Sequence, residues 1–230
     1  MEIEDLNKDS KPDLVLGNHG LNTRFKASPE KPVKMYINDF DQNRTAEQII
    51  TTFNGEKPYP FVLRHDLVRQ MPYLKKKYLK YENYKDQTIE DIFEPEQFEN
   101  AVVLEVFETR TSIALNKGDG NFELKPLPIE AQFSPVYGIE IEDFDSDGNP
   151  DIILGGNFYK SKPEVGIYDA SYGTVLKGDG MGNFESILPQ ESGIFVKGQV
   201  RDMDNIEIGN RKALLIVKND DVPEIYYINN

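Results

Sequence analysis

Three short stretches of the chain place oxygen-bearing side chains at alternate positions. They are called loop A (residues 5–13), loop B (39–47) and loop C (143–151). Loop C is the most regular: carboxylates stand at positions 1, 3, 5 and 9, and Gly148 at position 6 permits the positive φ of a reversal. Alternate residues of a tight turn can point at one centre, and Ca²⁺ takes about six to eight oxygens. The spacing therefore predicts bound Ca²⁺ with a structural role.

The expected side-chain ligands are Asp5, Asn7, Asp9 and Asp13 in loop A, Asp39, Asp41, Asn43 and Glu47 in loop B, and Asp143, Asp145, Asp147 and Asp151 in loop C. The backbone carbonyl at position 7 would add one oxygen, and this position is Lys11, Thr45 or Asn149.

An EF-hand is the first rival interpretation of this spacing. It needs a bidentate Glu at position 12 and a helix on each side, whereas position 12 is Leu16, Ile50 and Leu154. A short apolar run closed by Gly follows loops A and C, which indicates a buried strand. We therefore expect each loop to join two strands. A second rival, an acidic turn without metal, stays open because Asp, Asn and Gly favour turns in any case.

Composition excludes several classes of function. The chain has 230 residues, 40 acidic and 26 basic, and a formal charge of −14, which argues against nucleic acid and anionic membranes as partners. No apolar run approaches the roughly 20 residues of a membrane helix, so no transmembrane segment is expected. The absence of cysteine removes disulfides, zinc–thiolate sites and thiol catalysis.

Part of the chain repeats. Residues 5–17 and 143–155 coincide at six of thirteen positions. A Gly-Asp-Gly element recurs at residues 118–120 and 178–180, before Asp143 and Asp202, and indicates a hairpin turn between strands. Residues 202–205 then resemble a fourth, degenerate loop, in which Ile206 and Asn210 stand where acids should be. We expect this stretch to hold no metal.

The acidic loop followed by an apolar strand and Gly, together with the Gly-Asp-Gly hairpin, resembles the FG-GAP/VCBS repeat family of integrin-α-like β-propellers. The overall likeness is to the C-terminal part of a long bacterial VCBS-repeat protein. This resemblance implies a propeller with Ca²⁺ in an inter-strand loop of each well-formed blade, and it carries over to the loop residues named above. It is specific for fold and weak for function.

The expected fold is mostly β: a partial β-propeller of about four blades with a small helical insertion. The expected divisions are residues 1–56 with two calcium loops, a helical insertion at 57–102, and further blades at 103–230 with one intact and one degenerate loop. Only four residues precede Asp5, and no signal peptide is visible. We therefore expect a fragment of a larger parent chain that holds the remaining blades, located outside the cell or in its envelope.

The stretch 57–102 contains helix signals. Leu63, Leu67 and Met71 have helical spacing before Pro72, and Thr88 with Asp91 resembles a capping box. Its basic side chains could receive an anionic ligand or partner; alternatively, they solvate the outer face of the insertion.

Two loops that follow strands are candidates for a ligand face, because equivalent loops of propeller blades gather on one side. Their polar and aromatic side chains could bind a sugar or a peptide, or could fill gaps between blades. The candidate residues are His19, Asn22, Arg24, Asn157, Tyr159, Tyr168, Asp169 and Tyr172.

Three functions remain open. The first is a calcium-stabilised adhesion segment that binds a protein or a glycan. The second is the non-catalytic part of a glycan-processing enzyme, although the sequence contains no recognisable catalytic constellation and Glu164 with Asp169 is the single carboxylate pair worth inspection. The third is a purely architectural segment.

Overall fold

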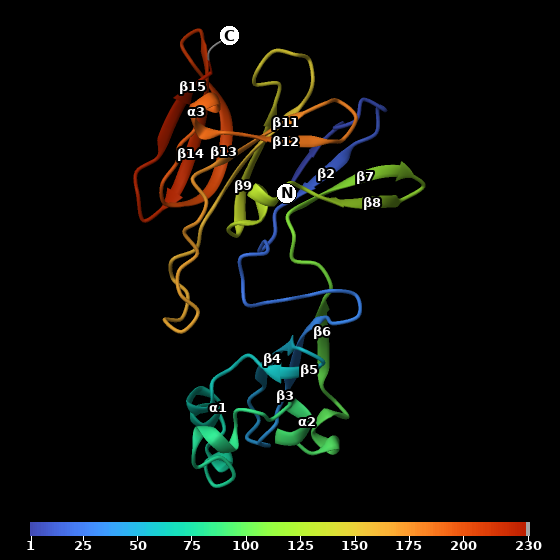
Figure 1. The fold of residues 1–230 in the computed structure, drawn as a ribbon, viewed down its shortest axis with the longest axis vertical. Coiled ribbons are helices and arrows are strands. Elements are labelled where there is room, and N and C mark those ends of the chain that lie inside the picture. Colours follow the sequence, from blue (N-terminus) through green and yellow to red (C-terminus); the bar gives the residue numbers. More distant parts are fainter. Residues whose placement is uncertain (229–230) are drawn as a thin grey trace. The chain divides into compact units, whose positions relative to one another are not determined.

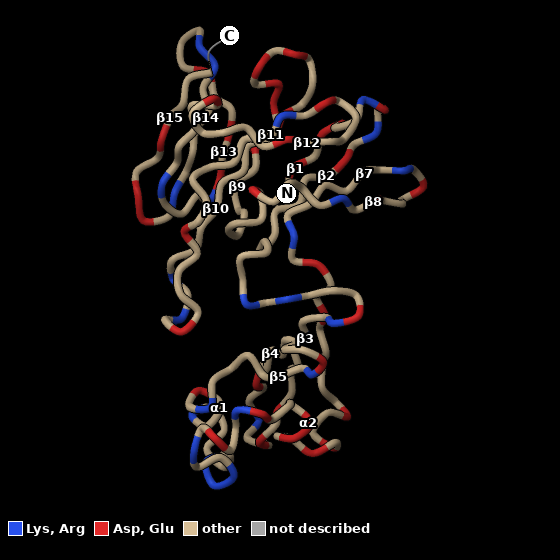
Figure 2. The backbone as a smooth tube through the Cα atoms, in the orientation of Figure 1, with Lys and Arg blue, Asp and Glu red and all other residues tan. Residues whose placement is uncertain are grey.

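The computed structural model describes residues 1–228, a mostly β chain with four antiparallel sheets. The chain divides into two compact units (Figure 1). Unit 1 comprises residues 1–24 and the chain from residue 110 onward, and unit 2 comprises residues 25–109. Acidic residues occur along both units, with basic residues dispersed among them (Figure 2).

Unit 1 contains three sheets, and in each of them neighbouring strands are antiparallel. The first has the order β1-β2-β7-β8, the second β9-β10-β11-β12 and the third β13-β14-β15. The strands are β1 (Glu2–Glu4), β2 (Asp13–Leu16), β7 (Ser112–Gly118), β8 (Asn121–Pro126), β9 (Val136–Glu142), β10 (Asp151–Gly156), β11 (Thr174–Gly178), β12 (Phe184–Ile187), β13 (Gln199–Ile208), β14 (Arg211–Asn219) and β15 (Glu224–Tyr227), with the short helices η4 (Ile129–Gln132) and α3 (Pro189–Ser192).

The second sheet lies between the other two, and its central strand β10 is buried along its whole length. Successive side chains of a strand point to opposite faces. Accordingly, Ile152 and Leu154 join a core shared with the first sheet, whereas Ile153 joins a core shared with the third. An apolar run without polar alternation is what a strand covered on both faces requires.

Two glycines permit the first strand of each following sheet to approach closely. A Cβ on Gly17, just after β2, would lie 3.0 Å from the carbonyl oxygen of Val136 in β9. A Cβ on Gly155, at the equivalent place in β10, would lie 2.7 Å from Val200 Cγ1 and 2.2 Å from Met203 Cε in β13. The glycine that closes each apolar run in the sequence is therefore a packing requirement between sheets.

The predicted fourth loop is not a loop. Residues 202–205 lie inside β13, paired with β14, and the two strands are joined by a two-residue turn at 209–210. Val200 and Met203 contact Gly155 at the same spacing as Val136 and Ile139 contact Gly17, so the place equivalent to an acidic loop is this tight turn. Both Gly-Asp-Gly elements do form the predicted hairpin turns, β7–β8 and β11–β12.

Unit 2 has one sheet of the order β5-β4-β3-β6, packed against short helices. Its elements are β3 (Val33–Asn38), β4 (Glu47–Asn54), β5 (Lys57–Pro60), α1 (Arg64–Gln70), η1 (Pro72–Lys75), η2 (Tyr81–Asn83), α2 (Ile89–Ile92), η3 (Pro95–Phe98) and β6 (Val102–Val106). The helix ending before Pro72 and the Thr88–Asp91 capping box are confirmed.

The placement of unit 2 in the chain differs from the expected division. Strands β2 and β7 pair with each other, so unit 2 is inserted between two neighbouring strands of the first sheet. It includes β3, β4 and loop B as well as the helical stretch predicted at 57–102. Among residues 1–228 the structure has four antiparallel sheets, three in unit 1 and one in unit 2, and the sheet of unit 2 has a different strand order.

Among the described residues, none of the helices is both long enough and apolar enough to cross a membrane.

The first strands of the three sheets in unit 1 bring acidic side chains together. Burial raises the pKa of Glu140 in β9 to about 7, and the carboxylates of Asp204, Glu2, Glu142 and Asp202 add to the rise. Glu140 Oε1 accepts a hydrogen bond of 2.7 Å from Asn205 Nδ2. At pH values between the ordinary pKa of glutamate and about 7, Glu140 is therefore protonated in the folded chain and ionised in the unfolded chain.

We predict that unit 1 loses stability as the pH rises through about 7, because the folded state binds a proton there that the unfolded chain has released. Glu140→Gln keeps the acceptor for Asn205 and should remove this slope, leaving the variant more stable than the wild type at about pH 8. Urea denaturation between about pH 5 and about pH 8 measures the effect. Glu207→Gln, at an exposed position of β13, is the control. Parallel wild-type and Glu140→Gln curves would contradict the prediction.

Candidate metal centres in three acidic loops

All three acidic loops connect two antiparallel strands that pair with each other. Loop A joins β1 to β2, loop B joins β3 to β4, and loop C joins β9 to β10. No helix flanks any of them, which confirms the inter-strand prediction and excludes an EF-hand arrangement.

The loops share one hydrogen-bond pattern. In loop C, the position 1 carboxylate of Asp143 accepts from the backbone N–H groups of Asp147 (3.0 Å) and Gly148 (2.8 Å). Asp145 at position 3 also accepts from Asp147 N, and Asp147 at position 5 accepts from Asn149 N. The same four bonds occur in loops A and B at the same positions. Identical bonding in all three copies indicates one shared conformation, independent of the residues between the ligands.

The shared conformation has left-handed residues at positions 4 and 6. They are Lys8 and Ser10, Gln42 and Arg44, and Ser146 and Gly148, with φ between 58° and 85°. Position 6 is left-handed in all three loops, but only loop C has glycine there. Glycine in the sequence therefore identifies only one of the three positions that adopt this conformation. Non-glycine residues in this region are strained, and the side-chain-to-backbone bonds of the loop offset that strain.

The position 9 carboxylate is buried and joins the loop to the sheet. Asp13 is fully buried; its Oδ2 accepts from Leu6 N (3.1 Å), and its Oδ1 accepts from Asn116 N (2.7 Å) in β7. Asp151 repeats both bonds, with Phe144 N at 3.1 Å and Gly178 N of β11 at 2.9 Å. Glu47 of loop B, 2% exposed, accepts from Phe40 N at 2.8 Å. The buried carboxylate at position 9 thus fixes each loop to the interior of the protein.

Carboxylate oxygens of positions 1, 3 and 9 lie close together in two of the loops. In loop B they belong to Asp39, Asp41 and Glu47, and in loop C to Asp143, Asp145 and Asp151, with the chosen oxygens all within 4.8 Å of one another. Oxygens that contact one Ca²⁺ at about 2.3–2.6 Å are at most about 5 Å apart. One cation could therefore contact all three carboxylates. In loop A, position 3 is Asn7, whose amide oxygen occupies the equivalent place in the hydrogen-bond pattern.

The electrostatics of the loops reflect burial first and crowding of like charges second. Burial raises the pKa of Glu47, and the carboxylates of Asp41 and Asp39 add to the effect. Burial likewise raises the pKa of Asp151, although backbone hydrogen bonds from Gly178 and Phe144 oppose it. A divalent cation in either loop would remove this repulsion.

Lysine side chains already neutralise part of two loops. Lys177 Nζ in β11 contacts Asp145 and lies 2.9 Å from Asp147, whose pKa its hydrogen bond lowers. In loop A, Lys11 lies 3.0 Å from Asp9, so its side chain is an ion-pair partner and only its carbonyl remains as a potential ligand. The spacing of residues along the sequence does not indicate Lys177, because only pairing between β10 and β11 brings it to loop C.

The residues predicted for a ligand face come from segments that meet in part: Tyr168 is bridged to Phe158, which lies between Asn157 and Tyr159, and the Tyr168 ring contacts His19. Asn157 is 2% exposed. Its Nδ2 donates to the carbonyl oxygens of Ser171 (2.7 Å) and Gly198 (2.9 Å), and its Oδ1 accepts from the Ser134 hydroxyl and the Ser171 backbone N–H. It holds the backbone together in the interior, contrary to the prediction of a ligand contact.

The other members of that set differ in burial. Tyr168 is buried and lies edge-on to His19, with ring centroids 4.9 Å apart, and Asn22 donates to the carbonyl of Phe133 at 3.1 Å. Arg24, Tyr159, Asp169 and Tyr172 are exposed, as is Glu164. Tyr172 stacks on the exposed ring of Phe195, with centroids 4.9 Å apart and an interplanar angle of 7°.

Comparison with known proteins gives no assignment: no protein-family model matches the chain, and no curated protein is significantly similar to it.

We predict that Asp13→Asn destabilises unit 1 even without metal, because an amide cannot accept both backbone N–H groups that Asp13 serves. Loss of one bond to a buried charged acceptor costs about 1.5–3 kcal/mol of unfolding free energy. Urea denaturation in a chelator measures this loss. Asp9→Asn changes a partly exposed carboxylate of the same loop and is the matched control. Equal stability of the two variants would show that the position 9 carboxylate has no anchoring role.

Proposed function

We propose that this chain is a calcium-stabilised β-propeller segment of the FG-GAP/VCBS type, from a secreted or cell-envelope protein, that binds a protein or glycan partner. The observation that carries the proposal is the identical hydrogen-bond pattern in three acidic loops, one of which lies in a separate unit. Turns that were acidic by chance would not share left-handed residues at positions 4 and 6 and a buried carboxylate at position 9.

The chemistry of the loops favours calcium over other cations. The side-chain donors at positions 1, 3, 5 and 9 are all oxygens, with neither His nor Cys among them, which suits a hard cation. Bound Ca²⁺ would supply positive charge where carboxylates crowd, and position 9 would connect that charge to the third strand of the sheet. The role is structural.

The arrangement of unit 1 supports the propeller part of the proposal. Strand β9 packs beside both β1 and β13, so the first strands of consecutive sheets are neighbours, as they are around a propeller axis. A closed propeller has about four to eight blades, and unit 1 has three sheets among the described residues. The proposal therefore includes further blades from a larger parent chain.

An exposed aromatic pair supports the partner-binding part. Tyr172 is 44% exposed and Phe195 50% exposed, and they stack on each other. Exposed stacked rings offer flat apolar surface beside polar groups, which a sugar ring or a peptide side chain can cover.

We predict that calcium stabilises unit 1 about twice as much as unit 2, because unit 1 holds loops A and C whereas unit 2 holds loop B. At about ten times the dissociation constant, each site adds about 1.4 kcal/mol. Two sites therefore raise the melting temperature of unit 1 by about 6–12 °C. Calorimetry of the full chain, with calcium at about 10 mM or with chelator, measures this.

Asp145→Asn should remove part of the gain in unit 1, and Asp119→Asn, an exposed acid of the β7–β8 turn, should leave it unchanged. Equal melting temperatures in calcium and in chelator would refute the metal part of the proposal.

For the partner, we predict that a glycan array detects binding and that Tyr172→Ala weakens it about three- to tenfold through loss of the aromatic contact. Tyr137→Ala is the matched control, since Tyr137 is similarly exposed but its ring lies against the guanidinium of Arg201, 4.3 Å away. An array without any bound glycan would leave a protein as the partner class, and equal binding by both variants would exclude the aromatic pair.

A further inference from the structure

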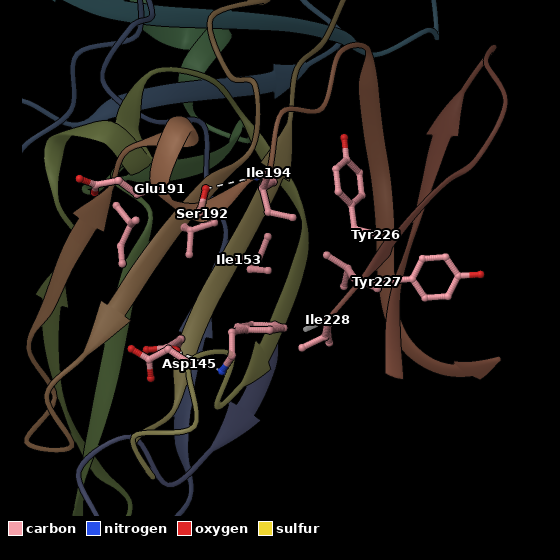
Figure 3. Close-up of a pocket in the computed structure, with 13 residues that line it drawn as sticks. Asp145, Ile153, Glu191, Ser192, Ile194, Tyr226, Tyr227 and Ile228 are labelled. Atoms are coloured by element: carbon pink, nitrogen blue, oxygen red, sulfur yellow. Dashed lines mark hydrogen bonds between the residues drawn. The ribbon is translucent and has the colours of Figure 1, made fainter. Parts of the chain in front are cut away.

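A pocket of about 390 Å³ lies inside unit 1 between the second and third sheets. One wall comes from β10, β11 and β12, and the other comes from β14, β15 and the segment around α3. Figure 3 shows Ile153 near the middle of the pocket, Asp145 toward one end, and Glu191, Ser192 and Ile194 toward the other. The volume is within the range of small-ligand sites, and an apolar cavity of about 150 Å³ already admits benzene.

The walls of the pocket are apolar. Ile153, Val175, Ile194 and Leu214 are buried members of the core between the two sheets, and Ile187 is partly buried against it. The hydroxyl of Tyr226 already has partners in the Phe195 carbonyl and the Glu224 carboxylate, both at 2.9 Å. The walls therefore select for a hydrocarbon body.

The charged groups of the pocket all have the same sign. Asp145, Asp151 and Glu191 line it, and neither Lys nor Arg is among its lining residues. Lys177 pairs with Asp145 from outside this set, and both Asp151 oxygens accept backbone N–H bonds. Glu191 at the other end has no such partner among the described residues that line the pocket, so the pocket keeps an excess of negative charge. Low-dielectric walls strengthen the field of that charge inside the pocket.

The pocket also leaves the apolar side chain at position 2 of loop C, Phe144, partly exposed. Leu6 and Phe40, at position 2 of loops A and B, are 0% and 1% exposed, whereas Phe144 at the same position is only partly buried and lines the pocket. A molecule in the pocket would cover Phe144, whose N–H is bonded to Asp151.

From the apolar walls and the excess of carboxylates, we propose that this pocket binds a small amine with an apolar body. The ammonium group lies toward Glu191, and the hydrocarbon covers the isoleucine side chains and Phe144. This site is separate from the exposed pair Tyr172–Phe195. A second consequence rests on the proposed function: because Asp145 and Asp151 belong to both the pocket and loop C, calcium and the amine oppose each other's binding.

The test uses 4-phenylbutylamine, with 4-phenylbutan-1-ol and 4-phenylbutanoate as the neutral and anionic analogues. The full chain is titrated in chelator, so that the result is independent of calcium, and the isoleucine methyl resonances are followed by NMR. We expect saturable binding of the amine with a dissociation constant of about 1 mM, weaker binding of the alcohol, and weakest binding of the acid. Added calcium should weaken binding of the amine more than that of the alcohol.

Two variants locate the site. Ile187→Phe fills the pocket and should weaken binding of the amine by about tenfold or more. The NMR spectrum of this variant must be that of a folded protein. Glu191→Gln, at an exposed position that tolerates change, should reduce the preference for amine over alcohol about two- to fivefold. Glu185→Gln, exposed on β12 and absent from the pocket lining, is the matched control.

Equal affinity for amine and alcohol, or an unchanged preference in Glu191→Gln, would overturn the proposal. Absence of saturation up to about 10 mM amine would do the same. Binding in chelator that is insensitive to calcium would support the pocket and count against a calcium ion in loop C, which separates failure of this inference from failure of the proposed function.

Discussion

The buried carboxylate at loop position 9 is the interaction on which the acidic loops depend. In loops A and C it accepts one hydrogen bond from its own loop and one from the third strand of the sheet. A charge inside a protein is tolerated only when such partners are present. These partners fix the direction of the carboxylate, so the remaining oxygens of the loop are gathered around a point set by the sheet and not by the turn alone.

Close approach between sheets is the second constraint. Gly17 and Gly155 lie where the first strand of the next sheet passes, and any side chain there would meet Val136 or Val200 and Met203. The second sheet consequently has apolar neighbours on both faces. The same stacking leaves the pocket between the second and third sheets, where the partly buried Phe144 and the carboxylates of loop C lie together. Loop chemistry and sheet packing are thus physically connected at one place in the molecule.

The loop conformation tolerates a change of surroundings. Loop B lies in unit 2, whose sheet order differs from that of the first two sheets, and its position 9 is Glu instead of Asp. Its internal hydrogen bonds are nevertheless those of loops A and C. Most of the bonds are local, between residues two to five apart, and the longer Glu47 side chain still reaches Phe40 N. A local pattern of this kind can recur in sheets of different topology.

The local pattern of the sequence determined the loops, the strands on either side of them, the Gly-Asp-Gly turns and the capped helix near Thr88, because each depends on contacts between residues close in the chain. The tertiary structure alone decided that β2 pairs with β7 across the whole of unit 2, that residues 202–205 belong to a strand, and that Asn157 is buried. It also decided that Lys177 meets loop C and that three carboxylates line one pocket. These features arise from pairing and packing between distant segments, and the spacing of residues along one chain carries no information about which distant strand will lie beside it.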